Sequence, residues 1–373
     1  MIKRDLTHAD IFDLLDAIFP FANSLGDDPS GWVVASPDRT AKGVAVALEA
    51  TPATLKAVGD KGASLLIVHH PPIYKPLQRI VSGDPAADIV FKAIRRNVDI
   101  LAAHTNADAS AGGLNDRLCR ALDMQVTGVI QPVEGYGRYK LVTFVPAQHA
   151  DAVAEAAFGQ GAGNIGEYSH CSFRTPGTGT FLPGAETEPF SGVKGGESRE
   201  PEIRLEMLVP ANRLGASIEA MIEAHPYEEV AYDVYPLKKY DPDAGIGRWA
   251  ALPRAVPFGE FADKVRRTLR LKALRRVGKP PRSVKQVAVC TGSGRSLLRT
   301  VAGRPGTVYL TGELGYHDER EAEALGICVL EGGHFGTERI FIDLIADALR
   351  EGLTGVPLVK IGIERDPVTL IQE

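Results

Sequence analysis

Short apolar runs that alternate with amphipathic stretches constrain the fold of this chain more than any other sequence feature. The run Leu65–Val68 is continuous and rich in β-favouring residues, which is typical of a strand buried on both faces of a sheet. A stretch with helical spacing of apolar residues follows at residues 86–96, and a second β-rich run follows that at residues 100–103. This alternation predicts a three-layer α/β domain with a parallel-rich sheet and right-handed crossovers.

The alternation stops near residue 133 and returns after residue 244. Between these points the predicted elements follow the order β-α-β-β-α-β, which indicates an inserted ferredoxin-like α+β domain. A chain of 373 residues is also longer than one compact core usually supports. We therefore predict an α/β domain made of residues 1–132 and 245–373, interrupted by an inserted domain of residues 133–244.

Several helix ends can be predicted from local signals. Thr7 followed by Asp10 resembles a capping box, and Thr51-Pro52 is typical of an N-cap followed by the first helical residue. The last long helix is predicted over residues 337–350.

Composition excludes some classes of protein. Lys and Arg number 42 and Asp and Glu 47, a net charge of −5, which argues against a general nucleic-acid binder. The basic stretch 264–282 is more simply a solvated surface than a nucleic-acid patch. We find no apolar run of membrane-spanning length and no signal peptide. The four cysteines lie far apart in the sequence, as expected for buried, reduced thiols in a cytoplasmic protein.

Histidine placement is the strongest functional signal. His69, His70 and His104 come just after the carboxyl ends of predicted strands, and His334 lies in a Gly-rich turn after another strand. In open α/β sheets this edge is where ligands bind. Separate segments that converge there predict a metal site, although a single histidine at a strand end is more often structural.

The spacing of the ligand candidates favours two metal ions. Neighbouring side chains of an extended strand point to opposite sides, so His69 and His70 are expected to serve different ions. His334 and Glu338 are four residues apart across a predicted helix start. Asp108 likewise follows His104 by four residues. A carboxylate in such a pair can bridge two cations. Imidazole with carboxylate suits Zn, Fe, Mn, Co or Ni better than Ca.

Longer motifs around these residues resemble one protein family. It is the NGG-interacting-factor-three-like family, also called the GTP cyclohydrolase I type 2 homologues, and the resemblance covers nearly the whole chain. The motifs that carry it are 66–73 (LIVHHPPI), 104–108 (HTNAD), 113–116 (GLND), 161–166 (GAGNIG), 225–229 (HPYEE) and 333–338 (GHFGTE). The stretch Leu25–Trp32 departs from the family pattern near the first strand.

The resemblance implies a dinuclear centre of two divalent metal ions per subunit. By position the metal ligands are His69, His70, Asp108, His334 and Glu338. The resemblance also implies a homohexameric toroid, a trimer of dimers, and likens the inserted domain to small signalling and copper-tolerance proteins.

Two adjacent divalent metal ions are typical of hydrolases, because they activate water and polarise the electrophile. In the cyclohydrolase interpretation, a metal-activated water molecule attacks C8 of a guanine nucleotide. This attack opens the imidazole ring of the guanine. His104 is the first choice for proton transfer, followed by Glu313 and His317. His104 could equally support Asp108, and His317 could be a capping or surface residue.

Other functions stay open at this point. The same metals could serve a phosphoesterase, or a non-catalytic metal-binding or regulatory scaffold. The loop 291–296 could hold a phosphate with Arg295, but a plain tight turn is the simpler interpretation. His225 and Tyr227 are better explained by packing at a helix–strand junction than by a second metal site.

Overall fold

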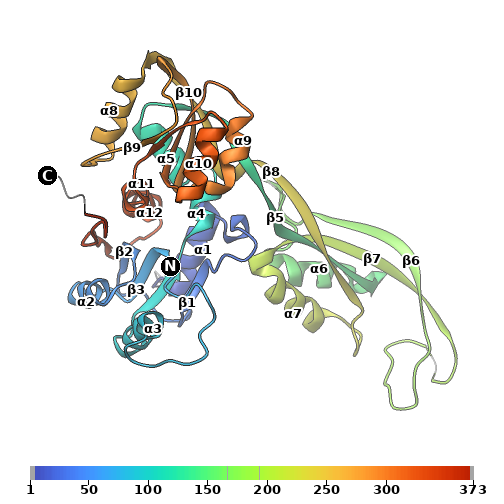
Figure 1. The fold of residues 1–373 in the computed structure, drawn as a ribbon. Helices are drawn as coiled ribbons and strands as arrows, with labels where there is room; N and C mark the ends of the chain where they lie inside the picture. Colours follow the sequence, from blue (N-terminus) through green and yellow to red (C-terminus); the bar gives the residue numbers. More distant parts are fainter. Residues whose placement is uncertain (1–4, 166, 193, 370–373) are drawn as a thin grey trace. The chain divides into compact units, whose positions relative to one another are not determined.

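The computed structural model describes residues 5–165, 167–192 and 194–369 of the chain, drawn along the sequence in Figure 1. Contacts divide the chain into two units. The main unit comprises Met1–Val133 and Asp241–Glu373, and the inserted unit comprises Glu134–Tyr240. The mixed α/β class predicted from the sequence is confirmed.

The first sheet of the main unit has the strand order β1-β4-β3-β2-β13. The strands β13, β2, β3 and β4 are parallel, and β1 pairs with β4 antiparallel at the edge. The strands are β1 (Gly31–Val34), β2 (Val44–Glu49), β3 (Leu65–His70), β4 (Asp99–Ala102) and β13 (Leu358–Lys360). The helices around this sheet are α1 (His8–Ile18), α2 (Pro52–Asp60), α3 (Pro85–Arg95) and α12 (Phe341–Leu349).

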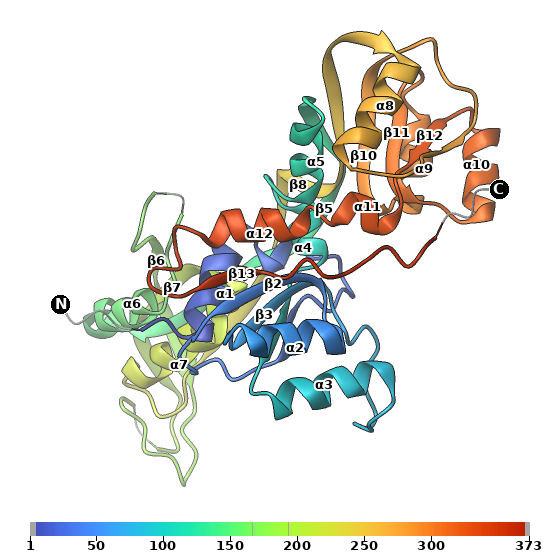
Figure 2. The same ribbon diagram turned by 90° about the vertical axis from the view of Figure 1, so that its left-hand side faces the viewer.

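Helices cover both faces of this sheet, as Figure 2 shows. On β3, Leu65 and Ile67 pack in one core cluster with residues of α1 and α12. The intervening Leu66 and Val68 pack in another cluster with residues of α2 and α3. All four side chains are fully buried, which explains why the run that encodes β3 has no polar alternation. The predicted three-layer arrangement is present here.

A second sheet follows in the main unit, with the order β8-β10-β11-β12-β9. We expected a single sheet in this domain. Instead, of the later strands that the structure describes, only β13 joins the first sheet. The strand β10 pairs antiparallel with β8, and β11, β12 and β9 follow it in order, so these strands belong to a different sheet. The strands are β8 (Tyr232–Pro257), β9 (Arg275–Val277), β10 (Ser283–Ser293), β11 (Val308–Glu313) and β12 (Cys328–Glu331).

Helices on both sides bury this second sheet too. One core cluster joins it to α5 and α8, and another joins it to α9 and α10. These helices are α5 (Leu114–Ala121), α8 (Phe258–Thr268), α9 (Leu298–Ala302) and α10 (Tyr316–Ala324). Two short helices, α4 (Thr105–Ala109) and α11 (His334–Glu338), carry residues predicted to bind metal.

The inserted unit has the strand order β6-β7-β5-β8, and its elements follow one another as β5-α6-β6-β7-α7-β8. Leu141, Leu205 and Met207 belong to the core under its helices. Its ferredoxin-like class stays a prediction, and Gly166 of the glycine-rich motif lies outside the described residues. The elements are β5 (Gln125–Pro146), α6 (Ala150–Gly159), β6 (Ser172–Phe181), β7 (Ser198–Pro210) and α7 (Leu214–Ala224).

Local helix signals were informative at some ends and misleading at others. Thr7 and Asp10 form the predicted capping box of α1, and Thr51 caps α2 with Pro52 as its first residue. The helix predicted over residues 337–350 is instead two helices, because α11 ends at Glu338 and α12 begins at Phe341.

The structure also bears on the membrane and thiol predictions. Within the described ranges, no helix has the length and apolar character needed to cross a membrane. All four cysteines are free thiols. Cys119, Cys290 and Cys328 are buried as predicted, whereas Cys171 is partly exposed.

A buried polar cluster ties α1 to the first sheet. The ring of His8 is fully buried, with Nδ1 2.7 Å from Asp99 Oδ2 and Nε2 2.9 Å from Ser64 Oγ. Asp99 also pairs with Arg39 at 3.2 Å. The order Ser-His-Asp imitates a catalytic triad, but Ser64 and Asp99 are buried as well. The cluster therefore stabilises the fold by hydrogen bonds that span distant segments.

We predict that His8→Ala lowers the free energy of unfolding by about 2–3 kcal/mol, because it leaves Asp99 and Ser64 buried without one of their partners. Urea unfolding of the metal-free protein measures the effect. The exposed His317 supplies a matched control, since His317→Ala should change stability by about 0.5 kcal/mol or less. Equal effects of the two substitutions would contradict this account of the cluster.

Candidate metal centre

The carboxylate of Glu338 lies among three imidazole rings in the main unit. Its Oε2 is 2.9 Å from His70 Nε2 and 3.0 Å from His334 Nε2. Its Oε1 lies 3.6 Å from His69 Nε2. His334 and Glu338 are the first and last residues of α11, so one helical turn aims both side chains at the end of β3.

His69 offers a free ring nitrogen to the site. Its Nδ1 lies 3.0 Å from the carbonyl oxygen of Ala103, and a carbonyl can only accept, so Nδ1 carries the proton that it donates. The other nitrogen, Nε2, is fully buried and has no hydrogen-bond partner. It points toward Glu338 and lies 3.8 Å from Asp108 Oδ2. A buried lone pair held in this way is what a metal-ligating histidine presents.

The adjacent rings of His69 and His70 converge, contrary to the expectation that they point apart. Their centroids are 4.9 Å apart, with 46° between the ring planes. The alternation of side chains fails here because His70 is the last residue of β3, where the strand ends. His70 Nδ1 lies 3.4 Å from Glu49 on the neighbouring strand β2, a contact that the sequence analysis missed.

Asp108 is held in place by residues from two other segments. Thr291 donates from Oγ1 to Asp108 Oδ1 at 3.1 Å. Asn115 donates from its side-chain amide to the Asp108 carbonyl at 3.0 Å and accepts from the Thr291 backbone N–H at 2.9 Å. The second carboxylate oxygen of Asp108 remains turned toward His69. Asn115 and Thr291 thus have a supporting role that no single motif revealed.

His104 is oriented by Asp28, a residue that the sequence analysis did not single out. The ring Nδ1 lies 2.6 Å from Asp28 Oδ1. The ligand atoms of His69, His70 and His104 lie within 4.8 Å of one another, so these three could hold a metal ion. Direct ligation is a role for His104 that we did not consider from the sequence. Asp28 lies in the stretch that departs from the family pattern.

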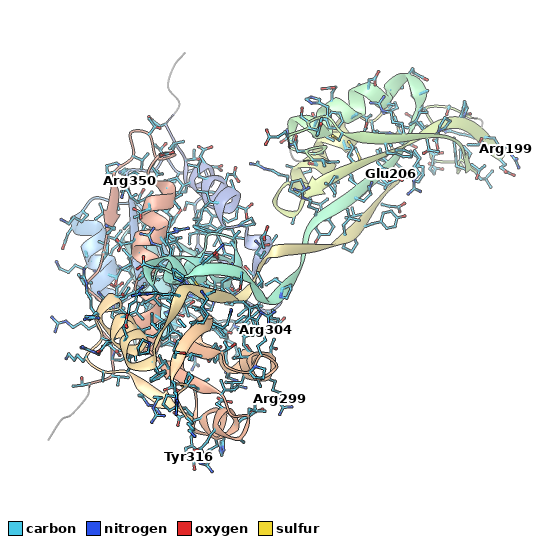
Figure 3. The ribbon with its side chains drawn as sticks, turned by 90° about the horizontal axis from the view of Figure 1, so that it is seen from above. Arg199, Glu206, Arg299, Arg304, Tyr316 and Arg350 are labelled. Carbon is cyan, nitrogen blue, oxygen red and sulfur yellow. The ribbon has the colours of Figure 1, made fainter. Side chains whose placement is uncertain are left out.

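The two other residues predicted for proton transfer lie in different surroundings. Glu313 Oε1 is 3.0 Å from His334 Nδ1, so Glu313 orients this ring. His317 is exposed on α10, where its ring contacts Tyr316 at a centroid distance of 5.4 Å. Figure 3 shows Tyr316 at the periphery of the main unit. The structure brings Glu313, but not His317, into contact with the cluster.

The carboxylates and imidazoles shift one another's pKa values. Burial lowers the pKa of His70, but hydrogen bonds to Glu338 and Glu49 outweigh it and raise this pKa to about 10. The hydrogen bond to Glu338 raises the pKa of His334 to about 9. Burial favours a higher pKa for Glu338, yet the surrounding histidines hold it well below its usual range. Without metal, the cluster therefore binds protons where a metal ion would bind.

A cavity of about 500 Å³ opens on this cluster. Tyr74, Thr105, Ser293 and Ser296 contribute to its wall beside the histidines and carboxylates. Arg295, considered above as a phosphate contact, does not line it. One of the two glycines of the 291–296 loop has a packing role instead. Gly292 has φ +61°, and a Cβ there would lie 2.1 Å from Glu338 Oε1.

Two groups of described residues could each hold a metal ion: His70, His334 and Glu338, and His69, His70 and His104. Ligand atoms on a tetrahedral ion with bonds near 2.1 Å lie about 3.4 Å apart. The separations of 2.9 to 3.8 Å around Glu338 and His69 approach this spacing. The chemistry and geometry of these residues therefore fit a divalent transition metal.

Known proteins resemble this chain over nearly its whole length. A Bacillus subtilis (strain 168) protein named GTP cyclohydrolase 1 type 2 homolog is 35% identical over 353 residues, covering 95% of this chain and 92% of its own. A Mycobacterium tuberculosis protein of the same name is 35% identical over 370 residues, 98% of this chain and 97% of its own.

Structural comparison finds a Bacillus cereus protein related to NIF3, whose crystal structure has a TM-score of 0.71 and 33% sequence identity, covering 99% of this chain and 100% of that one. The family model described as Duf34/NIF3 (NGG1p interacting factor 3) matches residues 6–367. The resemblance drawn from the sequence motifs is thereby confirmed, and this chain belongs to the Duf34/NIF3 family.

Proposed function

We propose that this protein binds two divalent metal ions and uses them to hydrolyse a substrate with a flat heterocycle, as a guanine nucleotide has. The observation that carries the proposal is the position of Glu338. One of its oxygens faces His70 and His334, and the other faces His69, which in turn faces Asp108. Glu338 therefore lies between two pairs of potential ligands, His70 with His334 and His69 with Asp108, and we propose that it bridges the two ions.

Bound in this place, two divalent ions lower the pKa of water toward neutrality and polarise an electrophile, which is the chemistry of hydrolysis. His104 then has a role of its own. Asp28 holds the proton on His104 Nδ1, which orients the ring and leaves Nε2 as the nitrogen with a free lone pair. His104 Nε2 can therefore accept a proton and return it to the leaving nitrogen.

The cavity beside the cluster indicates the size and shape of the proposed substrate. Its volume of about 500 Å³ lies within the range of small-molecule sites, roughly 300–1,000 Å³. Tyr74 is 66% exposed, and its ring centroid lies 6.5 Å from that of His104. An exposed aromatic face beside the proton-transfer residue offers a stacking surface for a flat heterocycle. The names of the curated relatives point to the same substrate class.

The number of metal ions bound per chain tests whether the carboxylate of Glu338 bridges two ions. After reconstitution with Zn, Mn or Fe, we expect two ions per wild-type chain and fewer than one in Glu338→Gln, because both ligand sets lose a charged oxygen. Elemental analysis of the purified protein gives the count. The exposed Glu351 provides the control, since Glu351→Gln should retain two. An unchanged count in Glu338→Gln would exclude this carboxylate as the bridge.

Metal affinity should rise with pH. The pKa values of about 10 for His70 and about 9 for His334 mean that both rings are protonated at pH 7 without metal. Because metal binding needs neutral imidazole, each ring must release its proton, and the apparent affinity should rise about 100-fold per pH unit between pH 6 and 8. Calorimetry in buffers of different ionisation enthalpy should show release of about two protons. A pH-independent affinity would contradict these protonation states.

Turnover is tested with GTP and a panel of phosphoesters. We expect ring opening of GTP by the metal-loaded protein, none in His70→Ala, and a fall in kcat of about 100-fold in His104→Gln. Metal counts on the same samples separate the roles of His104, because a proton-transfer residue leaves two ions bound. Loss of one ion in His104→Gln would make it a ligand. Two ions with no turnover of any substrate would overturn the hydrolase and leave a metal-binding scaffold.

A further inference from the structure

The inserted unit contains a cleft of its own, and we propose that it binds a small organic ammonium ion with an aromatic or apolar body. The cleft has a volume of about 610 Å³, and all of its lining residues lie within residues 144–231. This volume is in the usual range for small-molecule sites. The proposal is independent of the metal centre and of the function proposed for it.

Glu202 is a carboxylate that is buried in this cleft without a cationic partner among the described residues. Glu202 lines the cleft and is only 9% exposed. Its Oε1 accepts a hydrogen bond from the Tyr227 hydroxyl at 2.8 Å. Among the described residues, no donor reaches its Oε2, and no Lys, Arg or His pairs with it. Burying a carboxylate is unfavourable unless a cation or hydrogen-bond donors compensate it, so a cationic ligand would pair favourably with Glu202.

The backbone makes room for this carboxylate. A Cβ at Gly179 on β6 would lie 2.1 Å from Glu202 Oε2, so glycine is required for the carboxylate to occupy its position. Figure 3 labels Arg199 and Glu206 on β7, and Glu202 lies between them along this strand. The carboxylate therefore lies on a regular strand that fixes its direction.

The one arginine that lines the cleft does not neutralise Glu202. Arg204 donates from Nε to Glu206 at 2.8 Å, and its guanidinium lies 5.8 Å from the ring centroid of Phe144. The lining carries three carboxylates, those of Glu202, Glu228 and Glu229, against this single cation, which leaves two negative charges in excess. An anionic ligand would be repelled.

Aromatic rings in the cleft favour a ligand that combines an ammonium group with an aromatic or apolar body. Phe190 is 51% exposed, and its ring centroid lies 5.9 Å from that of Tyr227. Phe144 and Phe181 line the same cleft. Aromatic faces attract ammonium groups and pack against apolar bodies, so they fit an arylalkylamine better than a metal ion. The residues that could group around a metal ion, within the described part of the chain, all lie in the main unit.

Both ring nitrogens of His225 form hydrogen bonds within the fold, whereas Tyr227 lines the cleft. Its Nε2 lies 3.1 Å from the Phe144 carbonyl oxygen, to which it donates, and its Nδ1 accepts from the Tyr227 backbone N–H at 3.2 Å. This agrees with the packing role inferred for the histidine of the 225–229 motif. The same contact positions Tyr227 to donate to Glu202.

Calorimetry on the full-length protein tests the site with phenethylammonium as the probe. We expect one saturable site per chain and an affinity at least about 10-fold lower in Glu202→Gln, which keeps the side-chain size and removes the charge. Glu219→Gln makes the same change on the exposed face of α7 and should bind as the wild type does. Phenylacetate, which has the same ring and the opposite charge, should not bind.

Three results would overturn the proposal: no saturable binding of phenethylammonium at millimolar concentration, equal affinity in Glu202→Gln, or equal binding of phenylacetate. Thermal unfolding shows whether Glu202→Gln keeps its structure. If it does not, Phe190→Ala replaces it, because this ring is half exposed and its removal should spare the fold. Unchanged affinity in Phe190→Ala would then reject the aromatic wall and the proposal with it.

Discussion

The contact of one carboxylate with three imidazole rings joins residues from the two sheets of the main unit. Glu338 meets His70 and His334 through one oxygen and His69 through the other. His69 and His70 end a strand of the first sheet, whereas α11 follows a strand of the second. The site therefore lies where the two sheets meet, and each sheet supplies part of the ligand set.

A metal ion at this site would compete with protons for the same ligand atoms. The low pKa of Glu338 and the raised values of His70 and His334 arise from mutual attraction between unlike charges. A divalent cation bound here would replace the protons on the rings and keep that attraction to the carboxylate. Without a metal ion, the charges of this cluster balance one another. Glu202 of the inserted unit differs from Glu338, since its side-chain hydrogen bond among the described residues is with the phenol of Tyr227 rather than with a cationic group.

Local sequence patterns allowed individual helices and strands to be predicted, but not which strands pair with one another in the sheets. The apolar run 65–68 and the capping signals at Thr7 and Thr51 act within a few residues, so the sequence alone predicts them well. The second sheet depends on the pairing of β8 with β10, which no local pattern encodes. The same limit hid Asp28, whose partner His104 lies 76 residues away. The long family motifs, rather than spacing alone, gave the ligand set.

The inserted unit separates the two halves of the metal site along the chain, and this affects the order of assembly. A chain emerging from the ribosome presents His69, His70 and Asp108 long before α11 exists, since 268 positions separate His70 from Glu338. Closing so large a loop is slow and entropically costly. During synthesis the early histidines are consequently exposed to adventitious cations without their bridging carboxylate. We expect the complete set of candidate ligands to come together only after α11 has been synthesised.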